Sequence, residues 1–144
     1  MRLTIHTDYA FKVLAFLIVN NERLCTVEEI AKVYKISKNH LFKVTNTLVK
    51  SGFIEAIRGK GGGLRLAKNT EELSLGTVIR ITEPDFALVE CFLSKNSCVI
   101  TPICQLKHIL NQALENFLKE LDNYNLNELI ANKEKVPLLF DELK

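Results

Sequence analysis

Hydrophobic residues recur at helical spacing in three consecutive segments at the start of the chain. The spacing predicts helices over 7–20, over 26–34 and from Ser37 to Gly52. Each segment opens on a Thr or Ser whose hydroxyl can accept a hydrogen bond from a backbone N–H of the first helical turn, and Glu29 adds the spacing of a capping box to the second. The predicted N-caps are Thr7, Thr26 and Ser37. The positions expected to be buried are Ala10, Val13, Leu14, Leu17, Ile18, Ile30, Ala31, Val33, Leu41, Val44, Thr45 and Leu48.

A glycine-rich hairpin follows the third helix. Residues 53–57 and 64–67 are predicted strands, since Leu and Arg alternate in the second, and the stretch 58–63 between them forms the tip. Two helices joined by a tight turn and followed by such a hairpin are typical of a winged helix-turn-helix, whose second helix enters the major groove of DNA. A P-loop is excluded, because its glycines lead through Gly-Lys-Ser/Thr into a helix, and here a strand follows.

The rest of the chain is predicted to be helical apart from one irregular segment. A short helix is expected over 74–82, because the residue before Pro84 disfavours helical geometry. Residues 85–102 show no sustained period, and another short helix is expected around 126–130. From residue 103, three- and four-residue steps predict a helix of roughly 27 Å with a seam like that of a coiled coil. The seam consists of Ile103, Leu106, Leu110, Ala113, Phe117 and Leu121, broadened by Leu114 and Leu118.

Charge is divided between the two parts of the chain. The formal net charge of +2 conceals 12 basic and 5 acidic residues up to Lys68, a net +7, against 7 basic and 12 acidic residues beyond it, a net −5. A positive first part suits the phosphates of a nucleic acid. We expect base contacts from Ser37, Asn39 and His40, although His40 serves equally well as a hydrogen-bonded surface residue. Phosphate or minor-groove contacts are expected from Lys38, Lys43, Lys50, Arg58 and Lys60, with Gly61 letting the backbone approach the duplex closely.

Three of the four cysteines fall within fourteen residues. The chain has no signal-peptide pattern and no run of the roughly 20 apolar residues that a membrane span needs, so a cytoplasmic, reducing location is expected. Cys91, Cys98 and Cys104 are too widely spaced for the Cys-x-x-Cys knuckles of structural zinc. Three thiolates suit an iron-sulfur cluster, either 4Fe-4S or 2Fe-2S, and leave the fourth position to another group or another chain. Buried free thiols are the alternative. Cys25, apart from the three, is expected to be a partly buried free thiol, with a regulatory thiol or an alternative ligand as the other interpretations.

Together these motifs resemble the family of iron-sulfur winged-helix repressors. The resemblance covers nearly the whole chain and rests on Met1-Arg2-Leu3-Thr4, Thr7-Asp8-Tyr9-Ala10, Ser37-Lys38-Asn39-His40, Arg58-Gly59-Lys60-Gly61-Gly62, Glu83-Pro84 and the three cysteines. Two further segments are most similar to the subgroup that senses nitric oxide, Cys104-Gln105-Leu106-Lys107 and Leu121-Asp122-Asn123-Tyr124. The subgroup that regulates cluster biogenesis carries a His three residues after the last Cys, a place that Lys107 occupies here, with His108 one position further on.

The resemblance implies a fold, a partner and a signal. It implies a mainly α fold with a small β-hairpin, divided into a winged helix-turn-helix DNA-binding region (1–82), a cluster-binding loop (83–102) and a dimerisation helix with a C-terminal tail (103–144). It implies a homodimer that represses transcription at inverted-repeat operators in double-stranded DNA, with the three cysteines and Asp8 of the partner subunit as cluster ligands. Nitrosylation of the cluster by nitric oxide would abolish operator binding. A carboxylate matches cluster iron less well than a thiolate, so Asp8 would leave first; alternatively, Asp8 is a first-turn carboxylate favoured by the helix dipole.

Two other classes of protein stay open at this point. One is a member of the same family that regulates cluster biogenesis, or a cluster-free thiol-redox repressor whose three cysteines oxidise to disulfides. The other is a small iron-sulfur redox protein. The sequence contains no nucleophile–base constellation and no cofactor fingerprint, so an enzyme is not expected.

Overall fold

The computed structural model describes residues 2–131 and 135. Within that part of the chain the fold is mainly helical with one two-stranded antiparallel sheet, as predicted. The helices and strands are α1 (Ile5–Val19), α2 (Val27–Tyr34), α3 (Lys38–Lys50), β1 (Ile54–Ile57), β2 (Gly63–Leu66), α4 (Leu75–Thr82) and α5 (Leu106–Asp122). Short 3-10 helices are formed by Thr70–Glu72, Glu90–Phe92 and Leu126–Leu129. None of the helices in the described ranges has the length and apolar character needed to cross a membrane.

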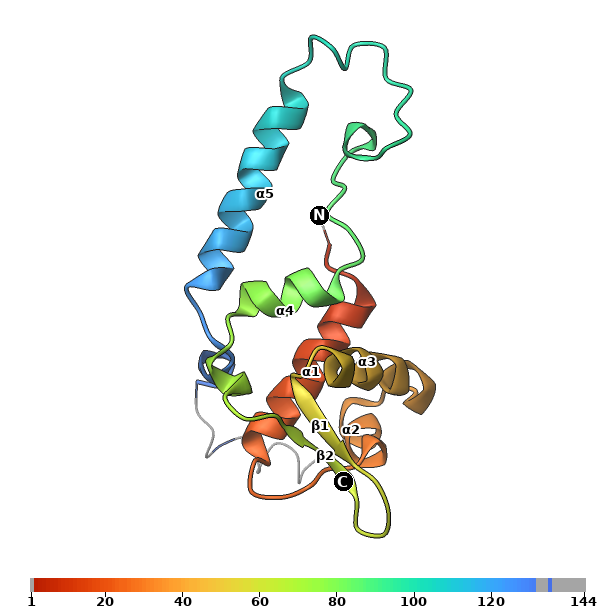
Figure 1. Cartoon of the computed structure of the whole chain (residues 1–144), viewed down its shortest axis with the longest axis vertical. Coiled ribbons are helices and arrows are strands. Elements are labelled where there is room, and N and C mark those ends of the chain that lie inside the picture. The colour runs from red at the N-terminus through yellow and green to blue at the C-terminus, as the bar shows by residue number, and fades with distance from the viewer. Residues whose placement is uncertain (1, 132–134, 136–144) are drawn as a thin grey trace.

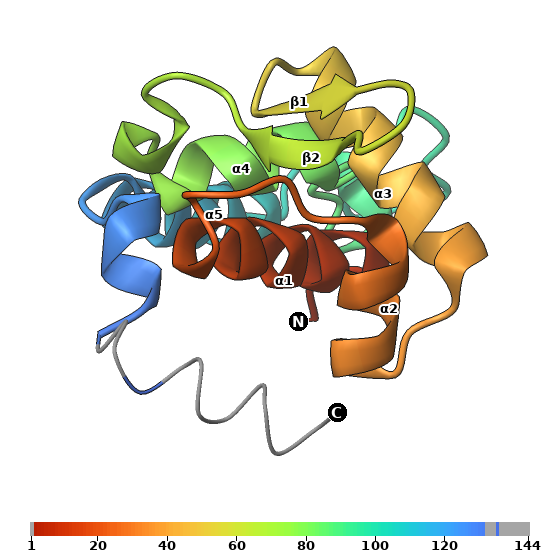
Figure 2. The same cartoon turned by 90° about the horizontal axis from the view of Figure 1, so that it is seen from below.

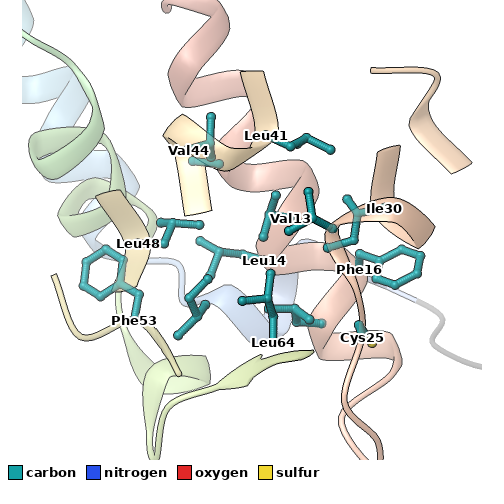
Figure 3. Close-up of a cluster of buried hydrophobic side chains, with 14 of the residues drawn as sticks. Val13, Leu14, Phe16, Cys25, Ile30, Leu41, Val44, Leu48, Phe53 and Leu64 are labelled. Atoms are coloured by element: carbon teal, nitrogen blue, oxygen red, sulfur yellow. The ribbon is translucent and has the colours of Figure 1, made fainter. Parts of the chain in front are cut away.

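Helix α1 lies at the centre of the fold (Figures 1 and 2). It packs against α3 on one side and α4 on another, and α4 in turn packs against α5. Burial of an aliphatic side chain contributes about 1.5–3 kcal/mol, so the fully buried stripe of α1 is a main source of stability. Figure 3 shows the resulting core, in which α1 meets α2, α3 and the hairpin. Its members include Val13, Leu14, Phe16, Cys25, Ile30, Leu41, Val44, Leu48, Phe53 and Leu64.

The turn between α2 and α3 has the predicted tight geometry. The capping box at the start of α2 is confirmed: the Thr26 hydroxyl accepts from the Glu29 N–H at 3.2 Å, and the Thr26 N–H donates to Glu29 Oε2 at 2.7 Å. Lys35 ends α2 in the left-handed conformation, with φ 53°. Ser37 is the residue before α3, as predicted, but its hydroxyl makes no capping hydrogen bond. Ser37 is exposed at the start of α3.

The hairpin, called the wing below, consists of β1, β2 and the tip 58–62 between them. Its antiparallel register pairs Ile54 with Leu66 and Ile57 with Gly63. The segment before α2 adds a further backbone pairing, since Cys25 N–H donates to the Leu64 carbonyl at 2.9 Å and Leu64 N–H donates to the Cys25 carbonyl at 2.7 Å. The wing is therefore joined to the connection between α1 and α2 as well as to α3.

Two predicted helix starts are wrong. The cap of α1 is Thr4 and not Thr7, because Thr4 is tied to Glu83 through its N–H at 2.8 Å, and its hydroxyl accepts from the Thr7 N–H. The long helix starts at Leu106 and not at Ile103, because residues 100–104 form turns in which the Ile100 carbonyl accepts two backbone N–H groups. In both cases the start of the helix is set by hydrogen bonds that cannot be predicted from the spacing of hydrophobic residues.

The predicted seam of α5 divides into two faces. Leu114 and Leu118 are buried and pack with Ile79 of α4. Arg80 and Asp122 add a two-pronged ion pair between the same helices, at 2.6 and 2.8 Å. The remaining seam positions are exposed or half-buried, with Leu106 at 50% and neighbouring Ile109 at 62%. Within its own chain, α5 therefore buries the residues expected only to broaden the seam, and of the predicted seam Phe117 and Leu121 pack partly buried against them.

Candidate DNA-binding surface and cysteine pocket

The outer face of α3 is polar and cationic. Because α3 buries Leu41, Val44, Thr45 and Leu48 at helical spacing, Asn39, Lys43, Asn46 and Lys50 project from the opposite side and are exposed. Lys43 and Lys50 form no ion pair within the described ranges. Lys38 does: its Nζ lies 3.2 Å from Glu28 Oε1 of α2. The pKa of the Glu28 carboxyl is lowered below its usual range, first by a hydrogen bond from the backbone N–H of Glu28 and then by Lys38.

His40 lies on the side of α3 that faces α1. Its ring centroid is 6.4 Å from that of Tyr9, with the two planes tilted by 36°. A pocket of about 220 Å³ separates the two helices here, lined by Ile5, His6, Tyr9, His40, Lys43 and Val44. The predicted base-contacting residue His40 is therefore also the point at which α3 meets the first turns of α1.

The tip of the wing presents unpaired cations. Arg58, Lys60 and Gly61 are all exposed, and Gly59 and Gly61 take φ values of 100° and 77° that side chains rarely adopt. Arg58 and Lys60 form no ion pair within the described part of the chain, whereas Arg65 on β2 bonds Glu55 at 2.7 Å. Free cations near an anionic partner are those that can neutralise its phosphates.

One prominent residue of α3 was missed by the sequence reasoning. Phe42 is 46% exposed although it is a large apolar side chain. The signal was present in the sequence, because Phe42 falls outside the helical spacing that predicts the buried face.

The three clustered cysteines line one pocket of about 170 Å³. All three are free thiols, with Cys98 exposed and Cys91 and Cys104 partly exposed. Polar contacts hold the intervening segment: Ser97 donates through its N–H and hydroxyl to Glu90 at 2.8 and 2.6 Å, and these bonds lower the pKa of the Glu90 carboxyl. The other lining residues are Val89, Glu90, Ile100, Thr101, Leu106 and Lys107. We refer to this site as the cysteine pocket.

The donor set of the cysteine pocket fits an iron-sulfur cluster in its chemistry. Three thiol donors on one loop match the sulfur ligation that such clusters take. In this conformation, however, no set of three or more His, Cys, Asp or Glu side chains in the described ranges is positioned to hold a metal ion. The cysteines share a pocket without converging on one point, so ligation requires them to move closer together.

Asp8, the predicted fourth ligand, does not line the cysteine pocket of its own chain. It lies in the first turn of α1 with its side chain 55% exposed, and its carboxylate accepts a hydrogen bond from Lys12 Nζ at 2.6 Å. Lys12 also lies 5.3 Å from the centroid of the Tyr9 ring. Asp8, Lys12 and Tyr9 thus form one surface group at the start of α1.

Cys25 is a free thiol, as predicted, and it is buried. Burial is the largest cause that raises the pKa of this thiol. Its side chain is part of the core and not of the cysteine pocket.

Comparisons with known proteins agree with the fold and with the class of function. The chain is 49% identical over 138 residues to the HTH-type transcriptional regulator NsrR of Bacillus subtilis, and 94% of each chain is covered. Among solved structures it is similar to CymR, the global cysteine regulator of B. subtilis, with a TM-score of 0.71 at 23% identity over 90% of this chain and 95% of that one. It is also similar to T. potens IscR, with a TM-score of 0.67 at 20% identity over 88% of this chain and 83% of that one.

These findings confirm the predicted winged-helix fold, the resemblance and the expectation of a regulator rather than an enzyme. Residues 3–132 match the Rrf2 family, described as iron-dependent transcriptional regulators. The chain belongs to the Rrf2 family of transcriptional regulators.

Proposed function

We propose that the protein is a homodimeric repressor that binds inverted-repeat operator DNA and senses nitric oxide through an iron-sulfur cluster. Cys91, Cys98 and Cys104 would hold the cluster, with Asp8 of the partner subunit as the fourth ligand. The observation that carries the proposal is that these three cysteines, up to thirteen positions apart in the chain, line a single pocket as free thiols. When bound, the cluster supplies iron atoms that nitric oxide attacks.

Exposed apolar surface supports the homodimer. Large hydrophobic side chains are exposed along α5 and the segment before it, and few of them touch the core of their own chain. A second copy can cover this surface and bring its own Asp8 towards the cysteine pocket. The residues concerned are Leu93, Val99, Ile100, Ile103, Leu106 and Ile109.

The unpaired cations support operator binding through α3 and the wing. Lys43 and Lys50 on α3 and Arg58 and Lys60 on the wing are exposed and free of ion pairs in the described ranges. In a two-fold dimer, two copies of α3 separated by about 34 Å would meet successive turns of the major groove. Phosphate contacts of this kind position the protein without reading sequence.

The start of α1 supplies a physical link between the two sites. Asp8 is held by Lys12, and the neighbouring Tyr9 faces His40 of α3. For Asp8 to act as a ligand in the partner subunit, its carboxylate must give up the hydrogen bond with Lys12 and bind the cluster in the partner's cysteine pocket. Loss of the ligand returns Asp8 to Lys12, which repositions the first turns of α1 against α3 and changes the separation of the two α3 helices.

The decisive experiment is an anaerobic spectrum of the purified protein during titration with nitric oxide, with operator binding followed on the same samples. We expect a brown protein whose colour bleaches as operator binding is lost. Cys98→Ala should lose both the colour and the nitric oxide response, whereas Cys25→Ala, outside the cysteine pocket, should keep them. The proposal of cluster sensing would be overturned if the protein is colourless and Cys98→Ala binds the operator as tightly as the unaltered protein. That result would still be compatible with a transcriptional regulator.

A cluster-free thiol switch is the second candidate. It is favoured by the three free thiols that line one pocket, together with the exposure of Cys98. In that case a mild oxidant would join two of the three cysteines in a disulfide and release the operator. Iron and sulfide analysis of the anaerobically purified protein, together with mass spectrometry after oxidation, distinguishes the two candidates. The thiol switch binds the operator without iron and releases it when the disulfide forms, whereas the cluster sensor needs bound iron and sulfide to respond.

A further inference from the structure

The exposed face of α3 carries two apolar side chains that the core does not use. Phe42 is 46% exposed and Val49 is 37% exposed. Neither belongs to the side chains that make up, or pack against, the two hydrophobic clusters of the described residues. Phe42 lies in the first half of α3, where a helix-turn-helix protein contacts base edges, whereas Val49 lies next to the end of the helix.

The surroundings of Phe42 are polar and cationic. Asn39 lies one turn before it and Asn46 one turn after it, and both are exposed. Lys43 follows it directly and forms no ion pair in the described part of the chain. The core of a protein–protein interface is depleted of charge, and a second copy of α3 would bring like charges together. The apolar surface of α5 lies on the other side of α1 and α4 (Figure 1).

We propose that Phe42 is a specificity-determining residue that contacts the C5-methyl group of a thymine in each half-site of the operator. In the major groove an A·T pair presents this methyl group beside N6 and N7 of the adenine. An asparagine side chain can bond both adenine atoms, and an apolar side chain covers the methyl group.

Phe42 and its two flanking asparagines supply both kinds of contact from one face of α3. The helix therefore selects A·T pairs beneath Phe42. The inference rests on the proposed binding of DNA through α3, and it adds the base that this residue recognises.

The test removes the methyl group and nothing else. The operator is the duplex that the protein itself selects from random DNA, and each of its thymines is replaced in turn by deoxyuridine, which pairs with adenine but lacks the methyl group. We expect one symmetric pair of positions at which replacement weakens binding by about fourfold for each methyl group, and by about fifteenfold when both half-sites are changed. Phe42→Ala should bind the thymine and deoxyuridine operators equally, and Phe42→Leu should retain part of the difference.

Val49→Ala is the matched control. Val49 is also an exposed apolar residue of α3, but it lies seven residues, or about 10 Å, further along the helix axis. This variant should retain the full deoxyuridine effect. The inference is overturned if Phe42→Ala retains that effect, or if no thymine of the selected operator responds while binding itself is intact. Failure to select any duplex would overturn the proposed operator binding, and this inference with it.

Discussion

Replacement of Arg58 by alanine tests the assignment of the wing to DNA. Arg58 is exposed at the tip and forms no ion pair within the described residues, so its charge is available to a phosphate. Each phosphate that a protein neutralises steepens the plot of log K against log salt by about 0.9. The proposed dimer would place two copies of Arg58 on the operator, so Arg58→Ala should make the slope shallower by about 1.8.

This change in slope has a measurable consequence for affinity. Between 50 and 200 mM salt, the log of the ratio of the two concentrations is about 0.6. The factor by which salt weakens operator binding over this range should therefore be about tenfold smaller for the variant than for the unaltered protein. The measurement is the fluorescence anisotropy of a labelled operator duplex, titrated with protein at four or five salt concentrations.

Arg65 provides the matched control on the same hairpin. Its guanidinium already bonds Glu55 at 2.7 Å, so Arg65→Ala removes a paired charge and should leave the salt slope nearly unchanged. The reasoning is refuted if Arg58→Ala leaves the slope unaltered, or if the two variants change it equally. Either result would show that pairing within the chain does not decide which wing cation meets phosphate.

Three further predictions concern the wing, the thiols and the junction of α4 with α5. Gly62→Ala should destabilise the protein by about 1–3 kcal/mol in thermal unfolding and weaken operator binding, because the added Cβ would collide with the backbone carbonyl oxygens of Ile57 and Gly59, which cannot swing away as a side chain can. Iodoacetamide should modify Cys98 long before Cys25, since burial raises the pKa of the Cys25 thiol and shields it; equal rates by intact mass spectrometry would contradict this. Hydrogen bonds from Arg80 lower the pKa of the Asp122 carboxyl, so this carboxylate stabilises the fold at neutral pH and the contribution disappears as pH falls through the lowered pKa. The difference in Tm between Asp122→Asn and the unaltered protein should therefore be largest near pH 7 and vanish in acid.

Local sequence signals predicted most of the first part of the fold. The capping box of Thr26 and Glu29, the stop before Pro84 and the alternation of Leu and Arg in β2 each depend on residues within a few positions of one another. The winged helix-turn-helix follows from these signals in order, and the three cysteines that were grouped by spacing do line one pocket.

Contacts between distant residues explain what the sequence did not predict. The cap of α1 depends on Thr4 meeting Glu83, seventy-nine positions away. Lys38 was expected to hold a phosphate, but the pairing of its ammonium with Glu28 arises only when α2 and α3 pack together. Whether Asp8 reaches a cluster depends on a second chain, so no pattern within one sequence can establish it, and the ligand role stays a prediction.

Helix α1 contacts both elements that we propose bind DNA, α3 and the wing. Its fifteen residues span about 22 Å. Near its start Tyr9 faces α3, and the segment after its end is paired with the wing through Cys25 and Leu64. A rotation of about 9° about either end therefore moves the other end by about 3.4 Å, which equals the rise of one base pair. Because the wing also packs against α3, a small angular change at the first turn of α1 moves the two elements together and is enough to shift them by about one base step along the proposed operator.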